Sequence, residues 1–218
     1  KNVPITAVLG DQQASLFGQN CIGSGDVKNT YGTGCFALTN TGSEIVHSNN
    51  GLLSTVAYQK DGDKPQYAIE GSVSIAGAAV QWLRDNLSII KDSSDIEALA
   101  MSEKDNGDVY FVPAFSGLFS PHWDETARGV LVGLSRFTNK SHIARAVLES
   151  VAYQSNELLE SMEKDIGITF ETVNVDGGMI INNLLMQFQS DIFNKKVISQ
   201  EINEITALGA GAASFLFI

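Results

Sequence analysis

The end of the sequence alternates strand-like and helical runs, and this alternation limits the fold more than any other feature. A long amphipathic helix is predicted from residue 141 to about 165, and Gly167 can end it. The predicted elements that follow are a strand at 172–175, a helix at about 181–193, a strand at 196–199 and a helix from about 204. Alternating strands and helices favour an α/β domain in which a mixed sheet is flanked by helices.

The earlier part of the sequence adds strands joined by short turns. Two strand-like runs within 27–38 enclose a Gly-Thr-Gly turn, and runs at 52–58 and 66–70 enclose a turn cluster at 60–65. We expect these strands to form a meander, and the whole element order then matches the ribonuclease H-like plan. Further predicted elements are a strand at 5–9, helices at 12–17, 74–87 and 93–101, a buried strand at 109–115 and a short strand at 129–134.

The charge balance argues against nucleic acids and anionic membranes as partners. Lys and Arg total 14 against 25 Asp and Glu, which gives a net charge of −11. An acidic surface repels phosphate backbones and acidic lipid headgroups. No apolar run approaches the roughly 20 residues that a helix needs to cross a bilayer, so we expect no membrane span.

Cysteine and histidine give no basis for predicting a metal site or a catalytic triad. Cys21 and Cys35 lack the spacing of metal ligands, and the three histidines are scattered. Buried free thiols in a reducing compartment are the simpler state, so we expect a cytoplasmic protein. The sequence starts with Lys and ends in the apolar run 214–218. We therefore expect the chain to be a piece of a longer protein.

A carboxylate and two amides follow the first strand-like run, at Asp11-Gln12-Gln13. A strand tip that opens into a helix presents polar side chains at a sheet edge, where α/β proteins bind ligands. Asp11 could act as a general base towards a hydroxyl group. Gln12 can both donate and accept hydrogen bonds, which suits a neutral polyol. The alternative is that Asp11 only caps the helix that begins there.

Two glycine-rich turns could hold a phosphorylated ligand. Thr33 lies between Gly32 and Gly34, where the backbone can approach a phosphate and the hydroxyl can donate. Gly178 ends a diglycine after the run 172–175, where flat backbone could lie against a planar ring, and Asn182 could bond the same ligand. The alternatives are an ordinary hairpin turn for the first and a tight turn with an Asn helix cap for the second.

A glycine and a glutamine share one face of the predicted helix at 74–87. Gly77 and Gln81 are four residues apart, which is about one helical turn. Glycine inside a helix costs roughly 1 kcal/mol, so the close approach of another group would explain it. That group could be a ligand or a packed helix.

Together these stretches resemble the FGGY family of carbohydrate kinases over essentially the whole chain. Within the family they are similar to the C-terminal half of the glycerol kinases, because Asp-Gln-Gln follows the first strand-like run. The run 129–149 also matches the family's second signature. The other residues that carry the resemblance are 10–13, 29–35, 50–53, 77–84, 112–115, 123–124, 127–129 and 175–178.

The resemblance implies a role for each candidate residue. Asp11 would take the proton from a terminal hydroxyl of glycerol, and Gln12 would hydrogen-bond the polyol. Thr33 would contact the nucleotide phosphates. The other residues implied to line the nucleotide site are Gly77, Gln81, Gly178 and Asn182. Residues 1–218 would form the C-terminal, nucleotide-side domain of an actin-like ATPase fold.

The implied reaction is the phosphorylation of glycerol to sn-glycerol 3-phosphate, with ATP and Mg²⁺, by a homo-oligomeric protein. In this family the first phosphate-binding loop and several glycerol ligands belong to an N-terminal half, so the chain alone is expected to be inactive. Three alternatives remain: a kinase for another polyol or sugar, an inactive actin-like scaffold that binds nucleotide, and a structural interaction domain. The base at Asp11 argues against a scaffold.

Overall fold

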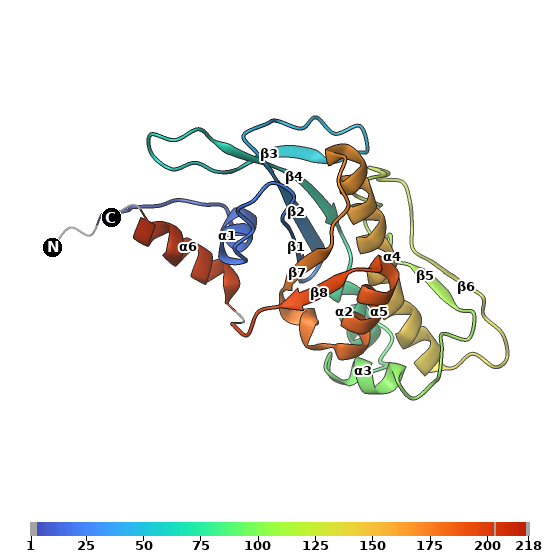
Figure 1. The fold of residues 1–218 in the computed structure, drawn as a ribbon. Coiled ribbons are helices and arrows are strands. Elements are labelled where there is room, and N and C mark those ends of the chain that lie inside the picture. Colours follow the sequence, from blue (N-terminus) through green and yellow to red (C-terminus); the bar gives the residue numbers. More distant parts are fainter. Residues whose placement is uncertain (1–3, 203, 217–218) are drawn as a thin grey trace.

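Six strands form one mixed sheet through the middle of the molecule (Figure 1). The structure, a computed structural model, describes residues 4–202 and 204–216. The strand order is β3-β4-β2-β1-β7-β8, in which β1, β7 and β8 run parallel and the other neighbours pair antiparallel. The six strands are β1 (Val27–Tyr31), β2 (Cys35–Gly42), β3 (Leu53–Tyr58), β4 (Gln66–Val73), β7 (Thr172–Asp176) and β8 (Lys196–Ser199).

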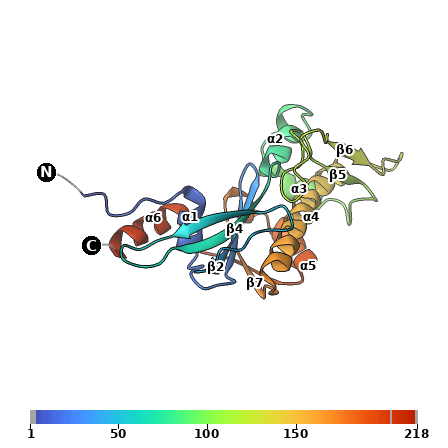
Figure 2. The ribbon, with the colours of Figure 1, turned by 90° about the horizontal axis from the view of Figure 1, so that it is seen from above.

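Helices cover both faces of the sheet. In Figure 1 and Figure 2 alike, α1 and α6 lie on one side of the strands and α4 and α5 on the other. The helices are α1 (Asp11–Gly18), α2 (Gly77–Asp85), α3 (Asp95–Ala100), α4 (Lys140–Ile166), α5 (Asn183–Phe193) and α6 (Ile205–Leu216). The prediction of an α/β fold with a mixed sheet flanked by helices is therefore confirmed.

The long helix α4 supplies much of the main core. Its start is fixed by Asn139, whose side chain accepts a hydrogen bond from the Ser141 N–H at 2.8 Å, and its end by Gly167 at φ 71°. The helix lies so close to the sheet that a Cβ at Gly71 would be 2.3 Å from Leu158 Cδ1. Both ends fall within one residue of the predicted ones, because capping residues mark them in the sequence.

The strand predicted at 5–9 is not formed. Residues 4–10 have no regular secondary structure, and Ile5 and Val8 are 86% and 85% exposed. A β-rich run becomes a strand only when another strand is there to pair with it, and within the described residues none lies beside this run.

The predicted meander is also wrong in its pairing. β4 lies between β2 and β3, so β2 pairs with β4 and not with the strand that follows it in the chain. Two hairpins, β1–β2 and β3–β4, therefore join edge to edge. Turn residues reveal each hairpin locally, but they do not say which edges meet.

The buried strand predicted at 109–115 is shorter and more exposed than expected. Strand β5 (Tyr110–Val112) pairs only with β6 (Val130–Val132), in a separate two-stranded sheet. Phe111 is buried, whereas Tyr110 and Val112 are exposed. Its nearly continuous apolar run is typical of a strand covered on both faces, but here only one face meets α4.

Helices α1 and α6 pack against each other through glycines. A Cβ at Gly209 of α6 would be 1.8 Å from the Ala14 carbonyl oxygen of α1. A Cβ at Gly18 of α1 would be 2.3 Å from the Ile205 carbonyl oxygen. The two backbones can approach this closely only without side chains at the contact, and α1 is the helix that carries Asp11.

We expect Gly209→Ala to lower the stability of the protein by about 3 kcal/mol, because a backbone carbonyl cannot yield as a flexible side chain can. Gly211 of the same helix is the matched control, because its Cβ would meet nothing within 4 Å. Gly211→Ala should raise stability by up to about 1 kcal/mol, since Ala is the better helix former. Thermal melting of the two full-length variants tests this. Equal melting temperatures would contradict the close-contact explanation.

Candidate functional site

One cavity brings together all five residues that the resemblance assigns to nucleotide binding. Its volume is about 550 Å³. We call it the glycine-lined cavity, and the five residues in its wall are Thr33, Gly77, Gln81, Gly178 and Asn182.

The cavity is built where two parallel strands end side by side. β1 pairs with β7 so that Thr30 lies opposite Asp176. The turn after β1 and the diglycine after β7 therefore meet at the same edge of the sheet. Gly177 has φ 95°, and a Cβ there would be 2.4 Å from the Tyr31 carbonyl oxygen. Only glycine allows the two turns to approach this closely.

The turn after β1 also holds the start of α2. The Gly77 N–H donates to the Gly32 carbonyl at 3.0 Å, and the Thr33 carbonyl accepts from Ala76 at 2.8 Å and from Ala78 at 3.1 Å. A Cβ at Gly77 would be 2.6 Å from the Gly32 oxygen. Close approach of the turn backbone therefore explains this glycine. Gln81, one helical turn later, lies in the cavity wall.

Asn182 has two functions in the structure. Its Oδ1 accepts a hydrogen bond from the Leu185 N–H at 2.8 Å, so the side chain caps α5 as the alternative interpretation expected. It also lies in the cavity wall together with Gly178, which begins a short 3₁₀ helix (Gly178–Ile181). Because the cap uses the amide oxygen, a ligand would meet the amide nitrogen, which is a donor.

Three polar residues in the wall of the cavity were not predicted from the sequence. Asp92, Ser93 and Glu97, from α3 and the turn before it, also line the cavity. Glu97 accepts a hydrogen bond from the Leu184 N–H at 2.9 Å and so links α3 to α5. These residues lie in and just before a short helix, and their sequence carries no ligand-binding pattern.

Asp11 and Gln12 lie outside this cavity, at the start of α1. Gly10 is the N-cap and Asp11 is the first helical residue. The alternative interpretation, in which Asp11 is the N-cap of this helix, is therefore wrong. Asp11 Oδ1 accepts from the Gln12 N–H at 2.9 Å. The Asp11 side chain is exposed, which leaves its carboxylate accessible to a ligand.

Buried polar side chains connect the start of α1 to the sheet beneath it. We call this group the α1 polar layer: Ser15 of α1, Gln19 directly after α1, Lys28 and Thr30 of β1, and Asp176 of β7, all buried except the half-buried Thr30. Asp176 Oδ2 accepts from Ser15 Oγ at 2.6 Å and from Gln19 Nε2 at 3.2 Å. Lys28 Nζ donates to Thr30 Oγ1 at 2.8 Å and to Gln12 Oε1. The layer therefore reaches from the diglycine turn to Gln12.

Lys28 is the charged residue of this layer that sequence reasoning missed. It is fully buried. Burial lowers its pKa to about 8, and the negative charges of Asp176, Glu70 and Asp11 oppose that shift. The only signal in the sequence was a lysine within an apolar and β-rich run, which is normally explained by an exposed strand face.

A second cavity of about 450 Å³ lies next to the glycine-lined cavity. The two share Gly178 and Ile181, and the second is also lined by Thr30 and Asp176 of the α1 polar layer. Asp176 Oδ1 is buried and has no hydrogen-bond partner within the described residues. The two cavities together extend from α2 and α3 towards α1.

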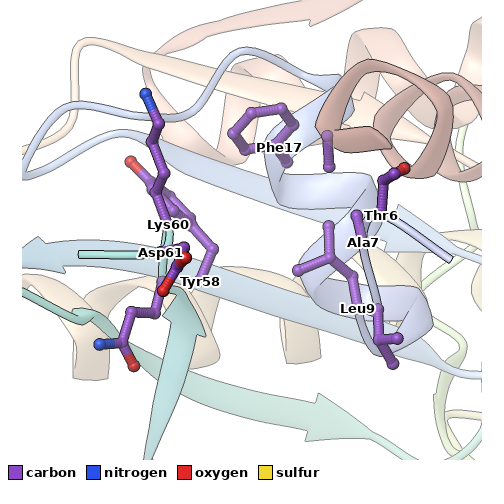
Figure 3. Close-up of a pocket in the computed structure, with 10 residues that line it drawn as sticks. Thr6, Ala7, Leu9, Phe17, Tyr58, Lys60 and Asp61 are labelled. Carbon is purple, nitrogen blue, oxygen red and sulfur yellow. The ribbon is translucent and has the colours of Figure 1, made fainter. Parts of the chain in front are cut away.

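A third cavity, of about 400 Å³, contains none of the predicted site residues. It lies between Thr6, Ala7 and Leu9 on one side and Tyr58, Lys60 and Asp61 on the other, and Phe17 lines it between the two groups (Figure 3). One wall is the segment that has no strand partner. No side chain with a buried, unpaired polar atom lies in this wall in the part of the chain that the structure describes, so we assign it no chemistry.

Comparison with known proteins identifies the family. Residues 27–215 match the model of the C-terminal domain of the FGGY family of carbohydrate kinases. The chain belongs to this family. The FGGY resemblance expected from the sequence is thus confirmed.

Relatives named glycerol kinase match nearly the whole chain. One from Brucella anthropi is 62% identical over 216 residues, which is 99% of this chain and 43% of the relative. One from Methylobacterium radiotolerans is 58% identical over 216 residues, again 99% of this chain and 43% of the relative. This FGGY chain therefore spans less than half the length of the curated relatives that it matches.

Solved structures agree with the fold. The crystal structure of Plasmodium falciparum glycerol kinase with ADP superposes with a TM-score of 0.92 at 44% identity, covering 99% of this chain and 43% of that one. Xylulose kinase from Lactobacillus acidophilus gives a TM-score of 0.80 at 23% identity, covering 92% of this chain and 40% of that one. The second match shows the shared FGGY fold alone.

Two further observations concern metal ligands and membrane-spanning helices in this FGGY domain. Within residues 4–202 and 204–216, no three His, Cys, Asp or Glu side chains converge as they would around a metal ion. In the same part of the chain, no helix is both long and apolar enough to cross a bilayer.

Proposed function

We propose that the full-length protein carrying this chain is an ATP-dependent glycerol kinase, which converts glycerol to sn-glycerol 3-phosphate. The observation that carries the proposal is the glycine-lined cavity, which gathers all five residues assigned by resemblance to the nucleotide, from three separate parts of the chain. The names of the relatives support glycerol as the acceptor. The catalytic domain described here would be the nucleotide-side half.

The nucleotide would bind along the backbone of the two glycine turns. Thr33 offers a hydroxyl and nearby N–H groups to phosphate oxygens, and the turn is held rigid by its bonds to the start of α2. Gly178 leaves open space above its backbone, where a flat ring can lie. Gln81 and Asn182 present amides to the ring edge.

The polyol would bind at the start of α1. Asp11 is an exposed carboxylate that can accept the proton of the attacking hydroxyl, and Gln12 beside it can hydrogen-bond the polyol. Phosphoryl transfer needs positioning and charge neutralisation more than covalent help from the protein. The role of Asp11 is therefore to orient the hydroxyl and remove its proton.

Mg²⁺ fits this arrangement only as an ion that arrives with the nucleotide. Mg²⁺ keeps several waters and commonly needs just one or two carboxylates besides the phosphates. The exposed carboxylate of Asp11 is the group that this part of the chain offers near the start of α1. When bound, the ion neutralises phosphate charge, which matters in a chain of net charge −11.

ADP release by the full-length protein tests the proposal, with Mg²⁺-ATP and a panel of glycerol, dihydroxyacetone, xylulose and gluconate. We expect the highest kcat/KM with glycerol. Faster turnover of another panel member would keep the kinase chemistry and discard glycerol. Nucleotide binding without turnover of any panel member would favour the inactive scaffold.

A further inference from the structure

We propose that Lys28 is a positioning residue for the polyol, which fixes the Gln12 amide so that its nitrogen faces the substrate. The inference rests on the proposed function and adds a residue to it. Lys28 lies on β1, beneath the start of α1, and neither the sequence motifs nor the comparisons assign it a role.

The Lys28 ammonium has a hydrogen-bond acceptor for each of its three N–H groups. Nζ donates to Gln12 Oε1, to Thr30 Oγ1 at 2.8 Å and to the Phe36 carbonyl at 3.2 Å. An ammonium has three N–H donors and no acceptor, so these three bonds use all of them. Because Lys28 can only donate, it can hold only the oxygen of the Gln12 amide.

The orientation of the amide decides what Gln12 presents to a substrate. With its oxygen on Lys28, Gln12 has its Nε2 on the side of Asp11, 3.4 Å from Oδ2. The amide nitrogen and the carboxylate then form a donor and acceptor pair at the start of α1. A hydroxyl group that gives its proton to Asp11 can accept from the Gln12 amide at its oxygen. The flipped amide would instead place two acceptors together.

The charges around Lys28 favour this arrangement at neutral pH. The negative groups that act on it from neighbouring elements are Asp11 of α1, Glu70 of β4 and Asp176 of β7, and Cys21 lies close as well. Burial nevertheless lowers the pKa of Lys28 to about 8. Below pH 8 the ammonium keeps all three donors. As the pH rises through 8 it loses a proton and one donor, and the hold on Gln12 weakens.

A double-mutant cycle in the full-length protein tests the inference, with Lys28→Met, Gln12→Ala and the double variant. We expect Lys28→Met to raise KM for glycerol at least about tenfold, the size of a lost bond to a charged group, and to change KM for ATP less than about twofold. In the Gln12→Ala background the same substitution should add less than about twofold, because a residue that acts through Gln12 has nothing left to position.

Lys195→Met is the matched control. Lys195 is another mostly buried lysine, paired with Glu163 at 3.0 Å on the far side of the sheet from α1. The Lys195→Met variant should lose thermal stability but keep its KM values for glycerol and for ATP. Independent, multiplicative effects of Lys28→Met and Gln12→Ala would overturn the inference, as would a folded Lys28→Met with an unchanged KM for glycerol.

A measurement without any Lys28 variant covers the case in which Lys28→Met does not fold. KM for glycerol in the unmodified protein should rise above pH 8, and Gln12→Ala should abolish that rise. A profile that stays flat to pH 9.5, or one that Gln12→Ala leaves unchanged, would contradict the inference. If the unmodified protein does not turn over glycerol at all, it is the proposed function that has failed.

Discussion

Replacing Asp11 by Asn in the full-length protein is expected to lower kcat with glycerol by about 10³-fold, within the range for loss of a general base. The substitution keeps the shape of the side chain and its hydrogen bond to the Gln12 N–H, which is 2.9 Å long in the structure. What it removes is the ability to take a proton from the hydroxyl. Because Asp11 lies outside the glycine-lined cavity, nucleotide affinity should change little. Steady-state kinetics and ADP binding measure the two effects separately.

Asp61→Asn is the control for this substitution. Asp61 is an exposed carboxylate in the turn between β3 and β4, in the wall of the third cavity and outside both cavities of the candidate site, and its variant should keep full activity. An Asp11→Asn protein with more than about a tenth of the original kcat would exclude general-base catalysis by Asp11, since that role contributes at least about 10²-fold.

The diglycine turn gives the second large effect, because its two glycines are needed for different reasons. A Cβ at Gly178 would meet nothing within 4 Å and would lie in the wall of the cavity. We expect Gly178→Leu to fill the space proposed for the nucleotide. KM for ATP should rise at least about tenfold, the equivalent of roughly 1.4 kcal/mol, with little change in melting temperature.

Gly177→Ala should mainly lower the stability of the protein, whereas Gly178→Leu should mainly raise KM for ATP. Gly177 has φ 95° and ψ 171°, a conformation that is essentially restricted to glycine. A Cβ there would also be 2.4 Å from the Tyr31 carbonyl oxygen. We expect a loss of stability of about 3 kcal/mol from the backbone strain alone. Thermal melting with and without ADP distinguishes the variants, and a Gly178→Leu protein that still binds ADP normally would show that the nucleotide lies elsewhere.

The fold was predictable wherever the signal is local to one element. The ends of α4 follow from Asn139 and Gly167, and the hairpin of β1 and β2 follows from its Gly-Thr-Gly turn. Pairing between distant segments was not predictable. The run at 5–9 has the composition of a strand but no partner in the described residues, and the edge at which β2 meets β4 depends on the whole sheet.

The candidate site was likewise predictable only in part. Five residues of the glycine-lined cavity could be named from the family resemblance, because its glycine turns leave a clear pattern in the sequence, whereas Asp92, Ser93 and Glu97 of the same cavity could not. Lys28 could not, because its importance comes from burial beneath α1 and from three bonds to separate segments. A lysine in a strand pattern is normally exposed, and only the packed structure shows that this one is not.

The parallel pairing of β1 with β7 has a consequence for how the protein is made. The second neighbour of β1 in the sheet is β7, which is synthesised only after β2, β3, β4 and α4. Contacts between such distant segments form slowly, because a long loop must close first. A nascent chain that ends before the diglycine turn would have no complete glycine-lined cavity. If ATP binds in this cavity as proposed, it would stabilise only the late, nearly finished domain and give no help to early folding intermediates.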